Sequence, residues 1–213
     1  MSMYVPHFNA VEDEQEIRRM VADVASAQLV TVGGDGYPWA TLLPVLWEGD
    51  TVIAHLARAN PHWKQIADES PALLVVTGPQ AYISPSWYAT KAEHGKVVPT
   101  WNYSAVHLTG RARIHQDPDW LRNAVEDLVE RHEAHRVEPW RTSDAPEKYI
   151  RGQLRAIVGV EVAVERVEGK AKLSQNRSEA DREGVVNGLK HEGTPGAALV
   201  AGQMYHDLER PTR

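Results

Sequence analysis

The segment from His55 to Ile66, read as HLARANPHWKQI, gathers cationic, amide and aromatic side chains after an apolar run. Asn60 and Pro61 are typical of a helix start, because asparagine caps a free backbone N–H and proline fits the first helical position. The free N–H groups of a helix start can bind an anion. Arg58 and Lys64 would add charge and hydrogen bonds to a phosphate. The spacing indicates either a phosphate site or a capped surface helix and leaves both open.

A second segment, Tyr82 to Tyr103, places aromatic residues among hydroxyl groups, an amide and lysines. Aromatic rings with polar neighbours suit a flat heteroaromatic ligand. A polar loop of the length of residues 87–100 is more often functional than not in a compact domain. The same tryptophans would also suit a subunit interface, so this segment predicts one of these two contacts.

A third segment, KAKLSQNRSEADREG, starts at Lys170 and follows a predicted strand. Without further context it is a solvated turn that leads to a helix capped by Ser178. Its glutamine and asparagine side chains both donate and accept hydrogen bonds, so they would also suit the edge of a ring.

Several enzyme classes lack their motifs here. The chain has no Walker loop, no Rossmann glycine fingerprint, no GxSxG and no HExxH. His132 and His135 flank Glu133 at a spacing that resembles a metal site, but they lie near the end of a polar helix face, so we expect no metal. The absence of cysteine excludes disulfides and thiolate ligands and fits a reducing cytoplasm.

The composition is that of a soluble globular protein: 213 residues, 42% hydrophobic and 24% charged. This length fits one domain, or one domain with a small appendage. A net charge of −6 argues against a broad DNA-binding surface, although a local basic patch would still be compatible with it. No apolar run reaches the ~18–20 residues that span a bilayer, so no membrane contact is expected.

The three segments are expected to be positioned by predicted strands and helices along the chain. Tight turns at residues 33–36 and 48–50 join three strands in an antiparallel meander within residues 28–57. Further strands are predicted at residues 72–86 and 101–116, and residues 154–175 are expected to form either a last strand pair or one long bent strand. Helices are predicted at residues 13–25, 60–70, 117–136 and twice in the tail. We therefore expect a mainly β fold with flanking helices, a six-stranded antiparallel barrel. The predicted domains are residues 1–170, with the N-terminal helix, and a helical extension over residues 171–213.

Six motifs occur in order along the chain: MYVPHF, HLARANPHW, YISPSWY, VPTWNY, AVHLTG and KLSQNR. Together they resemble the PaiB family, FMN-binding proteins described as negative transcriptional regulators. The resemblance extends from Met3 to about Lys190. It implies a split β-barrel of the FMN-binding type, related to pyridoxamine-phosphate oxidases. It also implies a homodimer with FMN in the cleft between the subunits.

The resemblance also implies site residues. The FMN phosphate is expected at Arg58, Asn60 and Lys64, with His55 as a weaker member. Backbone contacts to the ring are expected from Leu42 to Pro44. The side chains expected to face the ring or its ribityl chain, from either subunit, are Trp101, Asn102, Gln175 and Asn176. The basic residues that hold a substrate phosphate in the oxidases of this fold have no match here.

Three functions follow from these observations. The first is an FMN-binding repressor that acts on DNA or through a partner protein. The second is an FMN-dependent oxidoreductase, because a bound flavin brings its own redox chemistry. The third is a haem-binding or haem-degrading protein, because relatives of this barrel bind haem and the chain has 10 histidines. No catalytic residue is predicted for any of the three.

Overall fold

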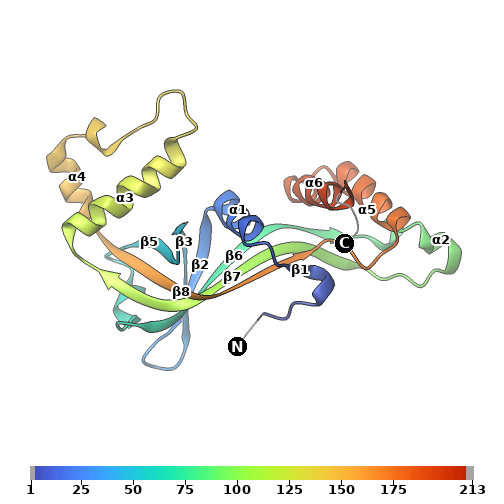
Figure 1. Cartoon of the computed structure of the whole chain (residues 1–213), viewed down its shortest axis with the longest axis horizontal. Coiled ribbons are helices and arrows are strands. Elements are labelled where there is room, and N and C mark those ends of the chain that lie inside the picture. Colours follow the sequence, from blue (N-terminus) through green and yellow to red (C-terminus); the bar gives the residue numbers. More distant parts are fainter. Residues whose placement is uncertain (1–2, 210–213) are drawn as a thin grey trace. The chain divides into compact units, whose positions relative to one another are not determined.

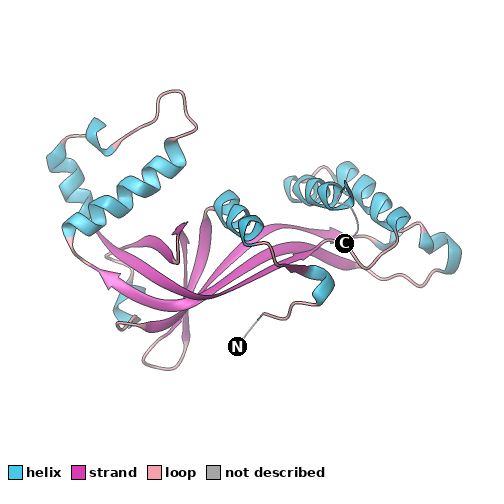
Figure 2. Ribbon diagram, in the orientation of Figure 1, coloured by secondary structure: helices cyan, strands magenta, loops and turns pink. Residues whose placement is uncertain are grey.

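The computed structural model describes residues 3–209 as two compact units. The barrel unit comprises Arg18–Val76 and His107–Val167. The helical unit comprises, within the described residues, 3–17, Thr77–Val106 and 168–209. Three long strands, magenta in Figure 2, each contribute a part to both units: β6 (Ser70–Ile83), β7 (Thr100–His115) and β8 (Ile157–Lys172).

The barrel unit is an antiparallel sheet in the order β3-β2-β6-β7-β8-β5-β4. Its shorter strands are β2 (Ser26–Val32), β3 (Pro38–Pro44), β4 (Leu46–Glu48) and β5 (Thr51–Ala57). Strand β3 also contacts β5, which brings the two ends of the sheet together. Burial alternates along the strands, as expected for a sheet with one face on a core. That core is formed by side chains such as Leu29, Val52, Leu74 and Val160.

The predicted turns are confirmed. The β2–β3 turn closes through a hydrogen bond from the Gly33 N–H to the Tyr37 carbonyl, and Gly36 has a φ of 81°. Gly49 has a φ of 52° in the β4–β5 turn, a left-handed conformation that glycine adopts at little cost. The strand predicted between these turns is split at Val45, whose N–H donates to the Ala25 carbonyl.

Some helices of the barrel unit were predicted from local sequence signals, and one was not. The helix α3 (Pro118–Glu133) begins after Asp117, whose side chain accepts hydrogen bonds from two backbone N–H groups. The predicted helix at residues 13–25 is α1 (Glu14–Val24), whose residues up to Ile17 belong to the helical unit and whose later residues belong to the barrel unit. The helix α4 (Glu147–Leu154) was missed by the sequence analysis and packs on α3 through Leu121. Two short 3₁₀ helices are η2 (Pro61–Gln65) and η4 (Thr142–Asp144).

The helical unit places two C-terminal helices on one face of β6, β7 and β8 (Figure 1). These are α5 (Glu179–Glu192) and α6 (Pro195–Glu209), which confirm the two helices predicted in the tail. Their core includes Ile83, Val185, Val200 and Met204. The remaining elements are η1 (His7–Asn9), β1 (Ala10–Val11), η3 (Pro85–Trp87) and α2 (Thr90–His94), and β1 pairs with β8.

The fold class predicted from the sequence is confirmed, with eight strands in the sheet in place of six. The predicted polar loop at residues 87–100 contains α2. The segment at Lys170 does not follow a strand, because β8 continues to Lys172. The domain boundary at residue 170 stays a prediction. Among residues 3–209, no helix is long and apolar enough to cross a membrane.

Candidate functional site

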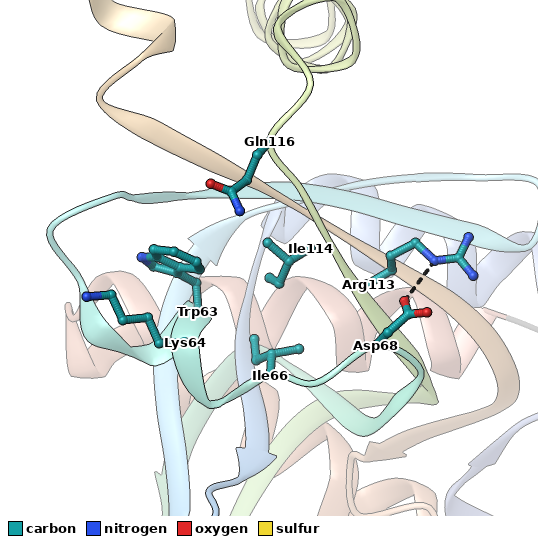
Figure 3. A pocket seen from close by; sticks show the side chains of 7 residues that line it. All are labelled: Trp63, Lys64, Ile66, Asp68, Arg113, Ile114 and Gln116. Carbon is teal, nitrogen blue, oxygen red and sulfur yellow. Dashed lines mark hydrogen bonds and ion pairs between the residues drawn. The ribbon is translucent and has the colours of Figure 1, made fainter.

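An open depression of about 470 Å³ lies beside η2 in the barrel unit. Trp63 and Lys64 lie on one side of it, the ion pair of Asp68 and Arg113 lies on the other, and isoleucine side chains lie between them (Figure 3). The lining residues are Trp63, Lys64, Ile66, Asp68, Arg113, Ile114 and Gln116. The predicted phosphate segment therefore forms a concave surface with cationic and aromatic side chains.

Asn60 caps η2, as the sequence predicted. Its side-chain oxygen accepts a hydrogen bond from the His62 N–H at 3.0 Å, and Pro61 occupies the first helical position. The other end of the amide donates to Thr41 Oγ1 at 3.3 Å. Because both ends of the Asn60 amide are used within the protein, Asn60 holds η2 against β3.

His62 is buried beneath the depression, with 1% of its surface exposed. Its ring nitrogens lie 2.9 Å from Thr31 Oγ1 and 2.8 Å from Thr41 Oγ1. Burial lowers the pKa of His62, which favours the neutral ring. A neutral imidazole has one donor and one acceptor, so both hydroxyl groups can be satisfied. His62 is therefore part of the support of η2.

Arg58 uses much of its hydrogen-bonding capacity inside the barrel unit. Its guanidinium donates to the carbonyls of Arg155 and Ile157 at 2.9 and 3.0 Å and to Gln116 Oε1 at 2.7 Å. Its own carbonyl accepts from the Trp63 indole N–H at 2.9 Å. A guanidinium carries five N–H donors, so only part of the group is left for a phosphate. Arg58 mainly joins β5 to the segment before β8.

Lys64 is the exposed cation of the depression. Its ammonium lies 5.6 Å from the centre of the Trp63 ring. Among the residues that the structure describes, no carboxylate lies within ion-pair distance of Lys64, whereas Arg113 is paired with Asp68 and Glu69. Lys64 therefore retains its charge for an external anion.

His55 lies on β5 opposite Gly159 of β8. Burial lowers its pKa, so the ring is expected to be neutral near pH 7. Its Nδ1 is buried and has no hydrogen-bond partner among the described residues. A neutral His55 would not add charge to a phosphate site.

Leu42 and Pro44 lie on β3, which is the last strand at one end of the sheet. Leu42 is 61% exposed and pairs with Gln28 of β2. The outer side of an end strand carries backbone N–H and C=O groups that no further strand binds. The predicted backbone contacts of Leu42 to Pro44 to a flavin ring stay a prediction.

The four other predicted residues lie in the helical unit. Trp101 is 46% exposed, and its indole N–H donates to Gln80 Oε1 at 3.0 Å. Asn102 is fully buried and donates to Ser174 Oγ at 3.0 Å, so its amide has partners within the core. Gln175 binds its own turn through the Leu173 N–H and the Ala171 carbonyl, and Asn176 is exposed.

The structure thus brings Arg58, Asn60 and Lys64 together at η2, and it separates Trp101 and Asn102 onto opposite faces of β7. The sequence analysis missed Gln116 and Arg113 as neighbours of η2. They lie about 50 residues further along the chain, and no local motif links them to η2. Trp63 was within the quoted motif, and the available signal was an aromatic residue directly before Lys64.

The comparisons with known proteins agree with these motifs. The family model described as "Putative FMN-binding domain" matches residues 3–166. "Protease synthase and sporulation protein PAI 2" of Bacillus subtilis (strain 168) is 34% identical over 212 residues, which cover 98% of this chain and 99% of that protein. The chain belongs to the PaiB family of FMN-binding domains. This confirms the family and the cofactor that the sequence predicted.

Solved structures resemble the PaiB-family chain in fold. The flavocytochrome Anf3 from Azotobacter vinelandii has a TM-score of 0.58 at 18% identity and covers 83% of this chain and 76% of its own. The FAD and heme binding protein from Mycobacterium smegmatis has a TM-score of 0.59 at 17% identity, with coverages of 77% and 73%. At these identities the likeness shows the fold alone, and it confirms the split-barrel class.

The residues at η2 fit the phosphate end of FMN. Lys64 supplies an ammonium that no carboxylate neutralises in the described part of the chain, and Arg58 retains N–H groups beyond its three internal bonds. The half-buried Trp63 supplies an aromatic ring beside both cations. The assignment of these residues to the cofactor stays a prediction.

Proposed function

We propose that this PaiB-family protein binds FMN through the depression at η2 and acts as a homodimeric negative regulator of transcription. The observation that carries the cofactor site is Lys64, an exposed ammonium beside the Trp63 ring with no carboxylate partner among the described residues. A phosphate in such a place gains a charge-assisted hydrogen bond without first breaking an ion pair.

The other residues of the segment would position the site. Asn60 and His62 fix η2 against β3 through Thr41, and Arg58 fixes the end of β5 against the segment before β8. Bound FMN would supply one- or two-electron redox chemistry of its own. The protein would therefore need to bind the phosphate, orient the ring and limit the access of water.

An apolar surface on β2 and β3 supports the homodimer. Leu42 and Val32 are 61% and 63% exposed, and Tyr37 at the turn between the strands is 72% exposed. The strand register places Val30 opposite Ala40 and Val32 opposite Pro38, so small and apolar side chains continue across both strands. An exposed apolar surface at the end of a sheet is typical of a protein interface. A second copy covering this surface would lie beside β3, where the ring contacts of Leu42 are predicted.

The regulatory role is proposed to act through a partner protein in the cytoplasm. The net charge of −6 does not favour a broad contact with DNA. In the barrel unit, Arg111 and Arg113 are both paired with carboxylates, which removes them from a free basic surface. The absence of cysteine in the whole chain is compatible with the reducing cytoplasm.

The cofactor site is tested by comparing FMN with riboflavin, which lacks the phosphate. Wild-type protein should bind FMN at least about 10-fold more tightly than riboflavin, because a charge-assisted bond to a phosphate is lost with riboflavin. Lys64→Ala should reduce this preference, whereas Lys148→Ala, which removes an exposed lysine of α4 in the same unit, should preserve it. An equal preference in Lys64→Ala and wild type would contradict the site.

The regulatory mode is tested by fluorescence anisotropy with duplex DNA from the promoter regions that respond to deletion of the gene. Flavin-loaded protein should show no saturable binding at about 150 mM salt, where non-specific contacts are weak. Tight, sequence-selective binding under these conditions would contradict action through a partner and would favour direct repression.

A further inference from the structure

One face of the three-stranded sheet in the helical unit is not covered by α5 and α6. Ala81, Ile83, Ala171 and Leu173 pack into the core beneath these helices. Because successive side chains of a strand alternate between the faces, the residues between them point to the other face. This face, which we call the open face, carries Gln80, Tyr82, Trp101, Tyr103, Lys170 and Lys172, and Tyr4 lies against it at Lys170.

The aromatic residues of the open face remain accessible. Tyr82 is 50% exposed and Trp101 is 46% exposed. Their ring centres lie 6.4 Å apart with planes inclined by 58°. The Trp101 indole N–H binds Gln80, which fixes the ring on the face. These rings present a fixed aromatic surface.

Lys170 places a buried positive charge in the same face. Only 6% of its surface is exposed. Its ammonium donates to the Tyr4 carbonyl at 2.9 Å and lies 5.1 Å from the centre of the Tyr103 ring and 5.6 Å from that of Tyr4. Carbonyl oxygens and ring faces stabilise an ammonium but leave its net charge uncompensated.

Lys172 lies two residues further along β8, on the same face as Lys170. Its ammonium donates to Thr100 Oγ1 and to the Trp101 carbonyl, the latter at 2.8 Å. These two bonds leave the third N–H of the group for another acceptor. Burial lowers the pKa of Lys172, and the positive charge of Lys170 lowers it further. Tyr103 partly offsets these effects by raising the pKa. Lys172 as a whole is half-buried, in contrast to the buried Lys170.

Neither lysine forms an ion pair within residues 3–208, and the nearest carboxylate along this face of β8, that of Glu168, accepts a hydrogen bond from the Met3 N–H at 3.1 Å. Two neighbouring positive charges that are partly removed from water repel each other, and an anion beside them would relieve this cost. The exposed ring of Trp101 lies next to the backbone carbonyl that Lys172 binds. The chemistry of the face therefore favours a ligand that is both flat and anionic.

We propose that the open face is a binding site for a small aromatic carboxylate or phosphate, whose anion contacts Lys172 and whose ring packs on Trp101 and Tyr82. Lys170, which is buried on the same face of β8, contributes a second positive charge. This site goes beyond the flavin function, since it uses none of the residues at η2. It also gives Trp101 a role that differs from the predicted contact with the flavin.

The test uses flavin-loaded protein and isothermal titration with benzoate, phenyl phosphate, benzamide and cyclohexanecarboxylate. Benzoate or phenyl phosphate should bind saturably, and the tighter of the two identifies the anionic group. Benzamide lacks the charge and cyclohexanecarboxylate lacks the flat ring, so both should bind at least about 10-fold more weakly.

Variants assign the binding to the open face. Lys172→Met should weaken the binding of the preferred probe at least about 10-fold, Lys172→Arg should retain it, and Trp101→Leu should weaken it. Lys96→Met, which removes an exposed lysine of the same unit, should leave it unchanged. If Lys172→Met fails to fold, the affinity of Trp101→Leu for the probe and the pH dependence of probe binding test the proposal in its place. Loss of probe binding on raising the pH should occur at lower pH in wild type than in Lys172→Arg.

Three results would overturn the proposal. One is the absence of saturable benzoate and phenyl phosphate binding by the wild type. A second is equal affinity in wild type, Lys172→Met and Trp101→Leu. The third is release of FMN by the probe, seen as free-flavin fluorescence, which would assign the lysines to the cofactor. If only a monomeric variant bound the probes, the open face would be a contact between two copies of the chain.

Discussion

Arg58 donates a hydrogen bond through Nη1 to Gln116 Oε1 at 2.7 Å, and this contact joins the end of β5 to the end of β7. The same guanidinium binds the carbonyls of Arg155 and Ile157 just before and within β8. Arg58 thus connects three strands at the edge of the depression, so it has a structural role whether or not it contacts a phosphate.

Arg58→Ala should lower the free energy of unfolding by about 1–3 kcal/mol, because two carbonyls and one amide lose a charged donor. Chemical denaturation followed by far-UV circular dichroism would measure the change. Lys64→Ala should stay within about 0.5 kcal/mol of wild type, since Lys64 is exposed and unpaired in the described structure. Equal stability of wild type and Arg58→Ala would show that these hydrogen bonds are not formed in solution.

His62 should make the stability depend on pH. Its pKa is lowered by burial in the folded state, so between pH 7 and 5 the unfolded chain binds more protons than the folded one. Stability is therefore fully present above the unfolded pKa of about 6.5 and is lost as the pH falls. His55 acts in the same direction. Denaturation midpoints between pH 5 and 8 should decline less steeply in His62→Gln than in wild type, and an identical slope would contradict this assignment.

Local signals predicted much of the fold. The helix α3 was expected from Asp117 and Pro118, and the structure begins it at Pro118. The turns at Gly36 and Gly49 were expected because their sequences supply residues that tolerate a positive φ. The helix α4 was missed because it is short, follows Pro146 and contains Gly152, so its apolar spacing is weak.

Contacts between distant segments were harder to predict. Asn102 stands in an aromatic and polar segment, and its type suggested a ligand contact. The alternation of β7 instead turns it into the core, where it binds Ser174, 72 residues away along the chain. Gln116 was not predicted beside Arg58, because the two residues meet only through the pairing of both β5 and β7 with β8. Residue type can be read locally, whereas the face of a strand depends on register.

Leu42→Glu should convert the proposed homodimer into a monomer, because it would replace an exposed leucine of the apolar surface on β2 and β3 with a charge. Size-exclusion chromatography with light scattering would measure the mass across a concentration series. Val137→Glu is the matched control, since Val137 is fully exposed in the same unit but lies outside that surface. A dimeric Leu42→Glu protein would mean that the interface lies elsewhere.

Gly159→Ala should destabilise the barrel unit through a contact that only glycine allows. A Cβ at Gly159 would lie 2.0 Å from the Trp120 ring, and that ring is held by stacking on His115 at 4.1 Å. The ring must therefore move, which should lower the free energy of unfolding by about 1–3 kcal/mol. Gly34→Ala is the control, because no atom lies within 4 Å of its added Cβ. If overpacking is the cause, Gly159→Ala should cost much less in a Trp120→Leu background, and additive effects in this double-mutant cycle would refute the steric explanation.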